Sequence, residues 1–192
     1  MAKIHPEEPT SSPCTFYRRE TYTLWMKSLV LHSNGCTVYD SNGDIVYRVD
    51  NYDQKGRREV NLMDLSGRVL CTIHKRLLGF GHWDVYRCSG SNSKSQDKPW
   101  FQVKRCYKIM KGQLTCQIIM ECQKYCVETI DGKKTFRIVD IDGDIVAHAE
   151  QKYSSSGIVL GNDVLKLEVE GGIDHSLIMA FVTVFGLISG RM

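Results

Sequence analysis

Short runs in which apolar and polar residues alternate recur through most of this 192-residue sequence. After residue 68, for example, the apolar side chains of Val69, Cys71 and Ile73 alternate with the polar side chains of Thr72 and His74. Because successive side chains of a β-strand point to opposite faces, this alternation places one face in a core and the other in water. Asn-Gly, Ser-Gly and Asp-Gly pairs break the runs, and such pairs are typical of tight turns between strands. The pattern therefore predicts an antiparallel β protein.

One turn scheme occurs at three places, in residues 38–46, 62–70 and 138–146. Each copy has two strand residues, an aspartate, two further residues, a glycine, a polar residue and two apolar residues. An aspartate side chain can accept a hydrogen bond from the backbone two residues later, and glycine tolerates a positive φ. The scheme therefore predicts three tight hairpins.

Further strands are predicted from the same alternation along the chain. They cover residues 24–31, 81–88, 100–107, 114–120, 126–130, 135–139 and 164–170. With the strands on either side of the three turns, the chain has about a dozen strands at hairpin spacing, which favours a barrel or a sandwich.

The last segment, residues 174–192, is apolar on every side and must be hidden from water, either by lipid as a tail anchor or by the protein itself. Twelve residues from Leu177 to Ile188 are uncharged and almost all apolar. They would form about 18 Å of helix, whereas a membrane span needs about 20 residues, so the length favours a buried helix. By propensity alone, the β-branched and aromatic residues between Phe181 and Phe185 could also form a strand.

A closed barrel explains the strands and the helix together. An open sheet of so many strands would expose its edges, whereas a closed barrel of about twelve strands is wide enough to hold one helix. We therefore predict an all-β domain over residues 15–192, a closed antiparallel barrel around a hydrophobic C-terminal helix. Residues 1–14 are rich in Pro, Ser, Thr and Glu and are predicted to form a flexible leader.

Composition limits the cellular setting. The net charge of +3 permits an anionic partner, but a dedicated DNA-binding domain is usually more basic, so direct nucleic-acid binding is not supported. The eight cysteines are scattered, and no export signal or N-glycosylation sequon accompanies them, so we expect reduced thiols. We expect a monomeric cytoplasmic protein with access to the plasma membrane and the nucleus, and not a secreted one.

Residues 140–144 resemble the start of an EF-hand calcium loop, because Asp140, Asp142 and Asp144 occupy its first, third and fifth positions, which supply ligands to the ion. The sixth position is Ile145 where the loop needs glycine, and the twelfth is Gln151 where it needs glutamate. The recurrence of the same scheme elsewhere in the chain favours a hairpin turn.

Other candidate chemistry also lacks the necessary partners. The pairs Cys122/Cys126 and His32/Cys36 have no second pair with zinc-site spacing. The glycine-rich stretch 79–83 lacks the third glycine of a nucleotide-binding loop, and there is no Gly-x-Ser-x-Gly nucleophile motif. The sequence therefore predicts a protein that is not an enzyme and that uses no cofactor and no metal.

Two basic groups in predicted loops are candidates for contact with an anionic partner. Lysine and arginine close to a membrane contribute about 1 kcal/mol each toward binding acidic lipid. Solvated hairpin tips are the simpler explanation and the one we favour, because acidic residues such as Asp50, Asp53 and Glu59 lie nearby. The first group is Lys55, Arg57 and Arg58. The second group, the predicted anionic-lipid patch, consists of Lys104, Arg105, Lys108 and Lys111.

The order of these features resembles that of the plant LURP-one-related (LOR) family. The resemblance rests on the Asp-x-x-Gly hairpins, the stretch 79–83, the run 161–169 and the terminal segment 174–189, and it extends from about Thr21 to Gly190. That family is similar to the tubby C-terminal domain and the phospholipid scramblases, which implies a twelve-stranded barrel around a central hydrophobic helix. The tubby lipid-binding basic pocket has no counterpart motif here, and residues 140–151 do not match the scramblase calcium loop.

The resemblance implies a non-enzymatic, tubby-like binding module. Its partner would be an anionic membrane lipid such as a phosphoinositide, or a regulatory protein, in plant defence or stress signalling. The alternative implied by the resemblance is a phospholipid scramblase-like membrane protein anchored by its C-terminal helix.

Overall fold

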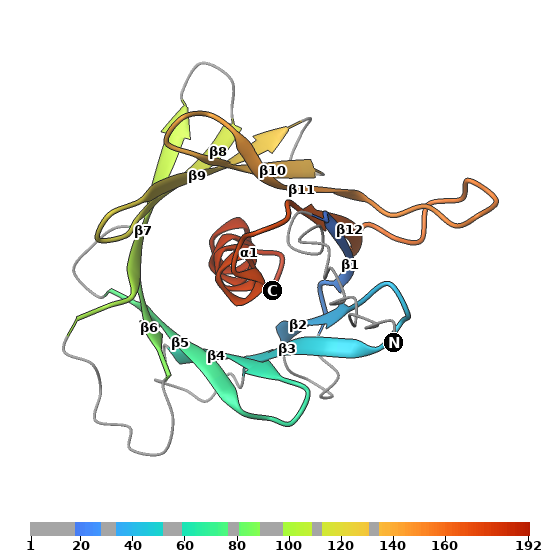
Figure 1. The fold of residues 1–192 in the computed structure, drawn as a ribbon, viewed down its shortest axis with the longest axis horizontal. Coiled ribbons are helices and arrows are strands. Elements are labelled where there is room, and N and C mark those ends of the chain that lie inside the picture. Colours follow the sequence, from blue (N-terminus) through green and yellow to red (C-terminus); the bar gives the residue numbers. More distant parts are fainter. Residues whose placement is uncertain are drawn as a thin grey trace, which may run out of the picture.

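The computed structural model describes residues 18–27, 34–51, 59–76, 81–88, 98–108, 113–130 and 135–192. These residues form twelve β-strands and one α-helix (Figure 1). In chain order the elements are β1 (Glu20–Trp25), β2 (Asn34–Tyr39), β3 (Ile45–Asn51), β4 (Glu59–Asp64), β5 (Val69–Lys75), β6 (His82–Arg87), β7 (Phe101–Lys108), β8 (Gln113–Ile119), β9 (Lys124–Ile130), β10 (Thr135–Asp140), β11 (Ile145–Gln151), β12 (Val164–Val169) and α1 (His175–Ser189).

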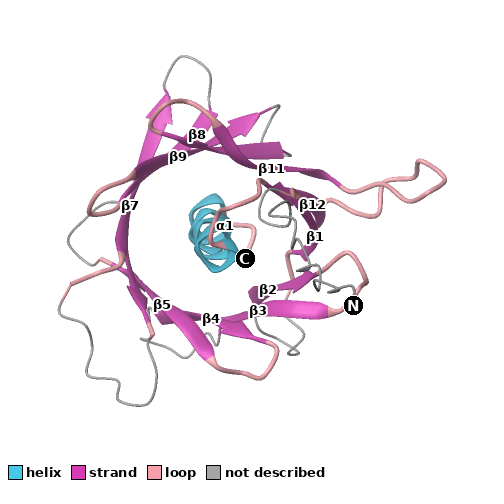
Figure 2. Cartoon of the chain, in the orientation of Figure 1, coloured by secondary structure: helices cyan, strands magenta, loops and turns pink. Residues whose placement is uncertain are grey.

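The strands form a closed antiparallel barrel in which each strand pairs with its neighbours in the sequence. β1 and β12 close the barrel, with Glu20 opposite Val169 and Trp25 opposite Val164. Figure 2 shows the ring of strands in cross-section, with the helix on its axis. The predicted barrel is confirmed, and closure leaves no strand in it with a free edge.

The alternation of apolar and polar residues determines which side chains enter the barrel. On β12, Leu165, Leu167 and Val169 are buried, whereas Lys166 and Glu168 are half-buried on the outer face. Lys166 and Glu168 form an ion pair there, with their charged atoms 2.7 Å apart. Alternate side chains of such strands thus enter a single core, whereas β6 buries three residues in succession, Trp83, Asp84 and Val85.

The three aspartate turns form as the sequence predicts. In the turn between β2 and β3, the backbone N–H groups of Asn42 and Asp44 each donate to Oδ1 of Asp40 at 2.9 Å. The bond from Asp44, followed by the bonds from Asn42, lowers the pKa of the Asp40 carboxyl. Gly43 has a φ of 89°, which a side chain would disfavour. Asp64 and Asp140 organise the turns between β4 and β5 and between β10 and β11 in the same way.

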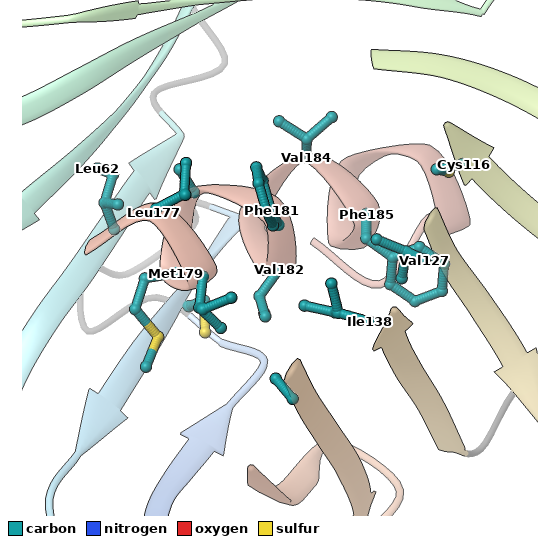
Figure 3. Packing of buried hydrophobic residues seen from close by; sticks show 14 of the residues in the cluster. Leu62, Cys116, Val127, Ile138, Leu177, Met179, Phe181, Val182, Val184 and Phe185 are labelled. Carbon is teal, nitrogen blue, oxygen red and sulfur yellow. The ribbon is translucent and has the colours of Figure 1, made fainter. Parts of the chain in front are cut away.

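The helix α1 runs along the barrel axis (Figure 2). Figure 3 shows its buried side chains, among them Phe181 and Phe185, between the surrounding strands. Its N-terminus is capped by Asp174, whose side chain accepts a hydrogen bond from the backbone N–H of Ser176 at 2.9 Å. It ends at Gly190, which has a φ of 70°, and the backbone N–H of Arg191 then bonds the carbonyl of Gly186 at 2.9 Å. Both ends therefore carry the capping chemistry expected of a helix.

Aromatic side chains fix the helix against the wall. The rings of Phe181 and Phe101 lie 5.0 Å apart, and those of Phe185 and Phe136 lie 4.8 Å apart. Surrounded by strands, the segment between Phe181 and Phe185 is helical despite its β-forming residues, because a helix satisfies its own backbone hydrogen bonds inside an apolar space. Among the described residues, no helix is both long and apolar enough to cross a membrane.

Some predicted boundaries differ from the observed ones. The strand predicted at residues 24–31 is β1, which ends at Trp25, because the backbone N–H of Met26 turns to the carbonyl of Asp163 at 2.8 Å. Residues 28–33 and the first two residues of the glycine-rich stretch 79–83 lie outside the described residues, as does the predicted leader, residues 1–14. The other three residues of that stretch are Gly81, which has a φ of 74°, and the first two residues of β6.

Candidate functional site: the arm end of the barrel

The barrel axis is occupied by the protein's own side chains. Every residue of α1 from Leu177 to Gly186 is buried, and the hydroxyl of Thr183 donates to the carbonyl of Met179 at 2.7 Å. Residues able to meet a partner therefore lie on the outer wall and at the two ends of the barrel. In the part of the chain that the structure describes, no group of three or more His, Cys, Asp or Glu side chains could hold a metal ion.

The two ends of the barrel differ in their connections. Because each strand reverses direction, successive hairpins lie alternately at opposite ends. The three aspartate turns, at residues 40–44, 64–68 and 140–144, share one end, here called the aspartate end. The connection between β11 and β12, residues 152–163, lies at the other end and is here called the arm. In Figure 1 the arm projects well beyond the barrel wall.

The backbone of the arm is ordered by its own hydrogen bonds. Tyr153 and Val159 form an antiparallel bridge, and Leu160 N–H donates to the carbonyl of Lys152 at 3.1 Å. At the tip, the hydroxyl of Ser154 accepts a bond from Ile158 N–H at 3.1 Å. The arm tip therefore repeats the geometry of the aspartate turns, with an uncharged serine in place of the aspartate.

Polar contacts hold the base of the arm against β1. The Asp163 carboxylate accepts hydrogen bonds from Lys27 Nζ at 2.9 Å and from the Trp25 indole at 3.1 Å. The lysine contact is the main cause of a lowered pKa for the Asp163 carboxyl. On the other side of the arm, the Lys152 ammonium bonds the hydroxyl of Thr23. The arm is thus a braced two-stranded projection.

The outer half of the arm exposes apolar side chains. The exposed fractions are 56% for Tyr153, 67% for Ile158, 43% for Val159 and 50% for Leu160. Single exposed apolar residues are ordinary, but three in succession on a projecting hairpin indicate a contact surface. Between Gln151 and Asn162 the chain has no carboxylate and a single charged residue, Lys152.

Three cations lie at the arm end of the barrel. Lys75 ends β5 and lies over the Trp83 ring, with its ammonium 5.7 Å from the ring centroid. Because α1 enters the barrel from the aspartate end, Arg191, which follows the helix, lies toward the arm end. Burial lowers the pKa of the Arg191 guanidinium. Among the described residues, none forms an ion pair with Lys75, Lys152 or Arg191.

The residues of the predicted anionic-lipid patch are placed separately. Lys104 is exposed on the outer face of β7, opposite His82. Arg105 is half-buried and lies on the same face of β7 as the buried residues Phe101 and Val103, four and two positions before it. Its side chain therefore points away from the face that carries Lys104. β7 also lies across the barrel from the arm (Figure 1). The side chain of Lys108, all of Lys111 and the first basic group, Lys55, Arg57 and Arg58, lie outside the described part.

A second polar cluster lies at the aspartate end, where α1 enters the barrel. The hydroxyl of Tyr22 donates to Oε2 of Glu20 at 2.6 Å and lies 2.8 Å from Nδ1 of His175. Arg87 pairs with the helix cap Asp174 at 3.2 Å and stacks over a tryptophan ring. Each of these groups has a partner within the protein, so the cluster serves to position the helix.

The arm was not among the sites predicted from the sequence. A signal was available, because Ile158, Val159 and Leu160 follow a Ser-Ser-Gly turn without any alternation of polar residues. Such a run is compatible with a fully buried strand, and only the observed exposure distinguishes the two cases.

Comparisons with known proteins agree with this architecture. A sequence profile of the family described as LURP-one-related matches residues 20–186. The chain is 47% identical to Protein LURP-one-related 4 of Arabidopsis thaliana over 99% of this chain and 88% of that protein. It is 40% identical to Protein LURP-one-related 11 of the same plant, over 98% and 89% of the two chains. The chain is therefore a central-helix barrel protein and belongs to the LURP-one-related family.

A solved structure shares the fold. The crystal structure of an Arabidopsis thaliana protein superposes with a TM-score of 0.62 over 89% of this chain and 91% of that chain, at 17% sequence identity. At that identity the likeness shows the fold alone.

Proposed function

We propose that this protein is a non-enzymatic binding module that attaches to membrane surfaces bearing anionic lipid, in the manner of tubby-like proteins. The observation that carries the proposal is the separation of charge between the two ends of the barrel. The aspartate end presents the carboxylates of the three turns, with cations such as Arg68 and Lys124 beside them. The arm end has Lys75, Lys152 and Arg191, which form no ion pair with any described residue. A negatively charged surface is attracted to the second end and repelled by the first.

Membership of the LURP-one-related family supports placing this activity in plant defence or stress signalling, with attachment at the plasma membrane and release to the cytoplasm or nucleus. A phosphoinositide is a suitable ligand, because lysine and arginine bind phosphate through charge-assisted hydrogen bonds. The helix α1 has no part in attachment under this proposal, since its apolar side chains contact the barrel interior.

Sedimentation with vesicles tests the proposal. The full-length protein should sediment with phosphatidylcholine vesicles that contain phosphatidylinositol 4,5-bisphosphate, and it should remain in the supernatant with phosphatidylcholine alone. Binding should weaken as salt is added, because the attraction is screened. The charge reversals Lys75→Glu, Lys152→Glu and Arg191→Glu should weaken binding when combined. Lys98→Glu, at the aspartate end, is the matched control.

The separately predicted patch can be tested in the same assay by charge reversal of Lys104, Arg105, Lys108 and Lys111. Absence of sedimentation at low salt would contradict the proposed function. Alkaline carbonate should release the bound protein, whereas a protein anchored through its C-terminal helix would stay with the vesicles.

A further inference from the structure

We infer that the arm is a membrane-inserting element, in which Tyr153, Ile158 and Leu160 enter the interfacial region of an anionic bilayer. The inference rests on the proposed function and adds to it a site and a mode of contact, because unpaired cations alone would keep the protein at the headgroups. The partner that we assign to the exposed surface of the arm is therefore a lipid bilayer.

The apolar residues of the arm are suited to a fluid apolar phase. They lie on a narrow, projecting hairpin and not in a groove, so a flat or concave partner of fixed shape would meet only the tip (Figure 1). A bilayer closes around a projection of any shape. Tyr153 adds an amphipathic ring of the kind that favours the level of the headgroups.

The backbone of the arm can enter an apolar environment at little cost. An unpaired N–H or carbonyl is strongly unfavourable in lipid. In the arm, three N–H groups near the tip are paired internally. Ser154 N–H donates to Ile158 O at 2.8 Å, Gly157 N–H donates to Ser154 O at 2.9 Å, and Ile158 N–H donates to Oγ of Ser154 at 3.1 Å. Because contacts at the base brace the arm, insertion does not require ordering a loop.

The charges of the arm favour an anionic lipid as its partner. Between Gln151 and Asn162 no carboxylate opposes approach to an anionic surface, and Lys152 lies where the headgroups would be. The exposed Ile141 provides the contrast. It is 69% exposed in a turn of the same kind, but the three carboxylates of Asp140, Asp142 and Asp144 surround it at the aspartate end.

Ile158 and Ile141 therefore form a matched pair for an experiment, because the residue type, the exposed fraction and the turn type are nearly the same. The probe is a phosphatidylcholine vesicle containing phosphatidylserine or phosphatidylinositol 4,5-bisphosphate. We expect the double substitution Ile158→Ser with Leu160→Ser to weaken sedimentation by about tenfold or more, on the scale of two lost apolar contacts. Ile141→Ser should bind as the wild type does.

A second measurement reports insertion directly. In Tyr153→Trp, the new indole should be quenched by lipids brominated on their acyl chains, whereas the fluorescence of wild-type protein on the same vesicles should change little. All four substituted side chains are exposed, so thermal unfolding and circular dichroism should match the wild type and exclude misfolding as a cause.

The outcomes separate the two proposals. If the wild type binds the vesicles and the double variant binds equally well, the inference about the arm is overturned and the proposed function stands. If no anionic vesicle binds the wild type, the proposed function itself fails. If light scattering shows a dimer that the double variant converts to a monomer, the arm is covered by a second copy of the chain and the inference is overturned.

Discussion

The hydroxyl oxygen of Tyr22 on β1 lies 2.8 Å from Nδ1 of His175, the first residue of α1, and joins segments 153 residues apart in the chain. The same hydroxyl donates to Oε2 of Glu20 at 2.6 Å. Burial, followed by the bond to Glu20, raises the pKa of Tyr22, so the phenol keeps its proton. One hydroxyl thus ties the barrel closure to the start of the central helix.

Removing that hydroxyl should destabilise the protein. We expect Tyr22→Phe to lower the free energy of unfolding by about 1 kcal/mol, because His175 and Glu20 lose a buried hydrogen-bond partner. Urea unfolding followed by circular dichroism measures the change. The matched control is Tyr153→Phe, which removes a hydroxyl from an exposed side chain of the arm. Equal stabilities for the two variants would contradict a role for the Tyr22 contact.

The central position of α1 makes it intolerant of charge. Ala180 and Val184 are fully buried, so Ala180→Asp or Val184→Asp should abolish folding, since an unpaired buried carboxylate is unfavourable by several kcal/mol. Phe185→Ala should leave a cavity against Phe136 and lower the free energy of unfolding by about 4 kcal/mol. Ile141→Asp, on an exposed turn, is the control. A stable, soluble Ala180→Asp protein would contradict the enclosed helix.

The buried thiols should resist alkylation. Burial raises the pKa of Cys36, Cys71 and Cys116 to about 12 in each case, so the reactive thiolate is scarce at neutral pH. Among the described cysteines of the folded protein, iodoacetamide should modify the exposed Cys122 first and these three only after unfolding. Mass spectrometry of timed digests measures the order. Rapid modification of Cys116 in native protein would contradict its placement inside the barrel.

The brace at the base of the arm should respond to pH in a defined direction. The pKa of Asp163 is lowered, chiefly by Lys27. The contribution of the carboxylate to stability is therefore fully present above the ordinary aspartate pKa and is lost as the pH falls through the lowered value. We expect Lys27→Met to raise the pKa of Asp163 toward its ordinary value, as measured by carbon NMR titration. Lys98→Met, far along the chain from the arm, should leave that pKa unchanged.

Loss of the brace should also loosen the arm. In Lys27→Met, amide hydrogen exchange should become faster at Leu160 and Ile158, whose N–H groups bond within the arm, and should stay slow in β10 and β11. Unchanged exchange at Leu160 would show that the hairpin is ordered by its own backbone bonds and not by the contact with β1.

Local patterns determined much of the architecture. Alternation identified the strands, the Asp-x-x-Gly scheme identified three hairpins, and the apolar stretch around Ala180 identified the helix and its enclosure. Each of these depends on chemistry between residues close in the chain: a side chain that caps its own turn, or a strand that separates two environments.

Other features depended on contacts between distant residues. β1 ends at Trp25 because Met26 meets Asp163, and no local property of residues 24–31 requires it. The predicted patch joined residues adjacent in sequence, but neighbouring strand positions such as Lys104 and Arg105 point to opposite faces. The patch itself remains a prediction.

The sequence by itself determined the family, the barrel and the buried helix, because hydrophobic periodicity and turn chemistry are local and the apolar tail is short for a membrane span. Only the tertiary structure decided which apolar residues stay exposed. The run Ile158, Val159 and Leu160 has the composition of a core strand, yet its side chains are exposed on an arm beyond the closed ring of strands. Burial is a property of the whole fold, since the axis is already filled by α1.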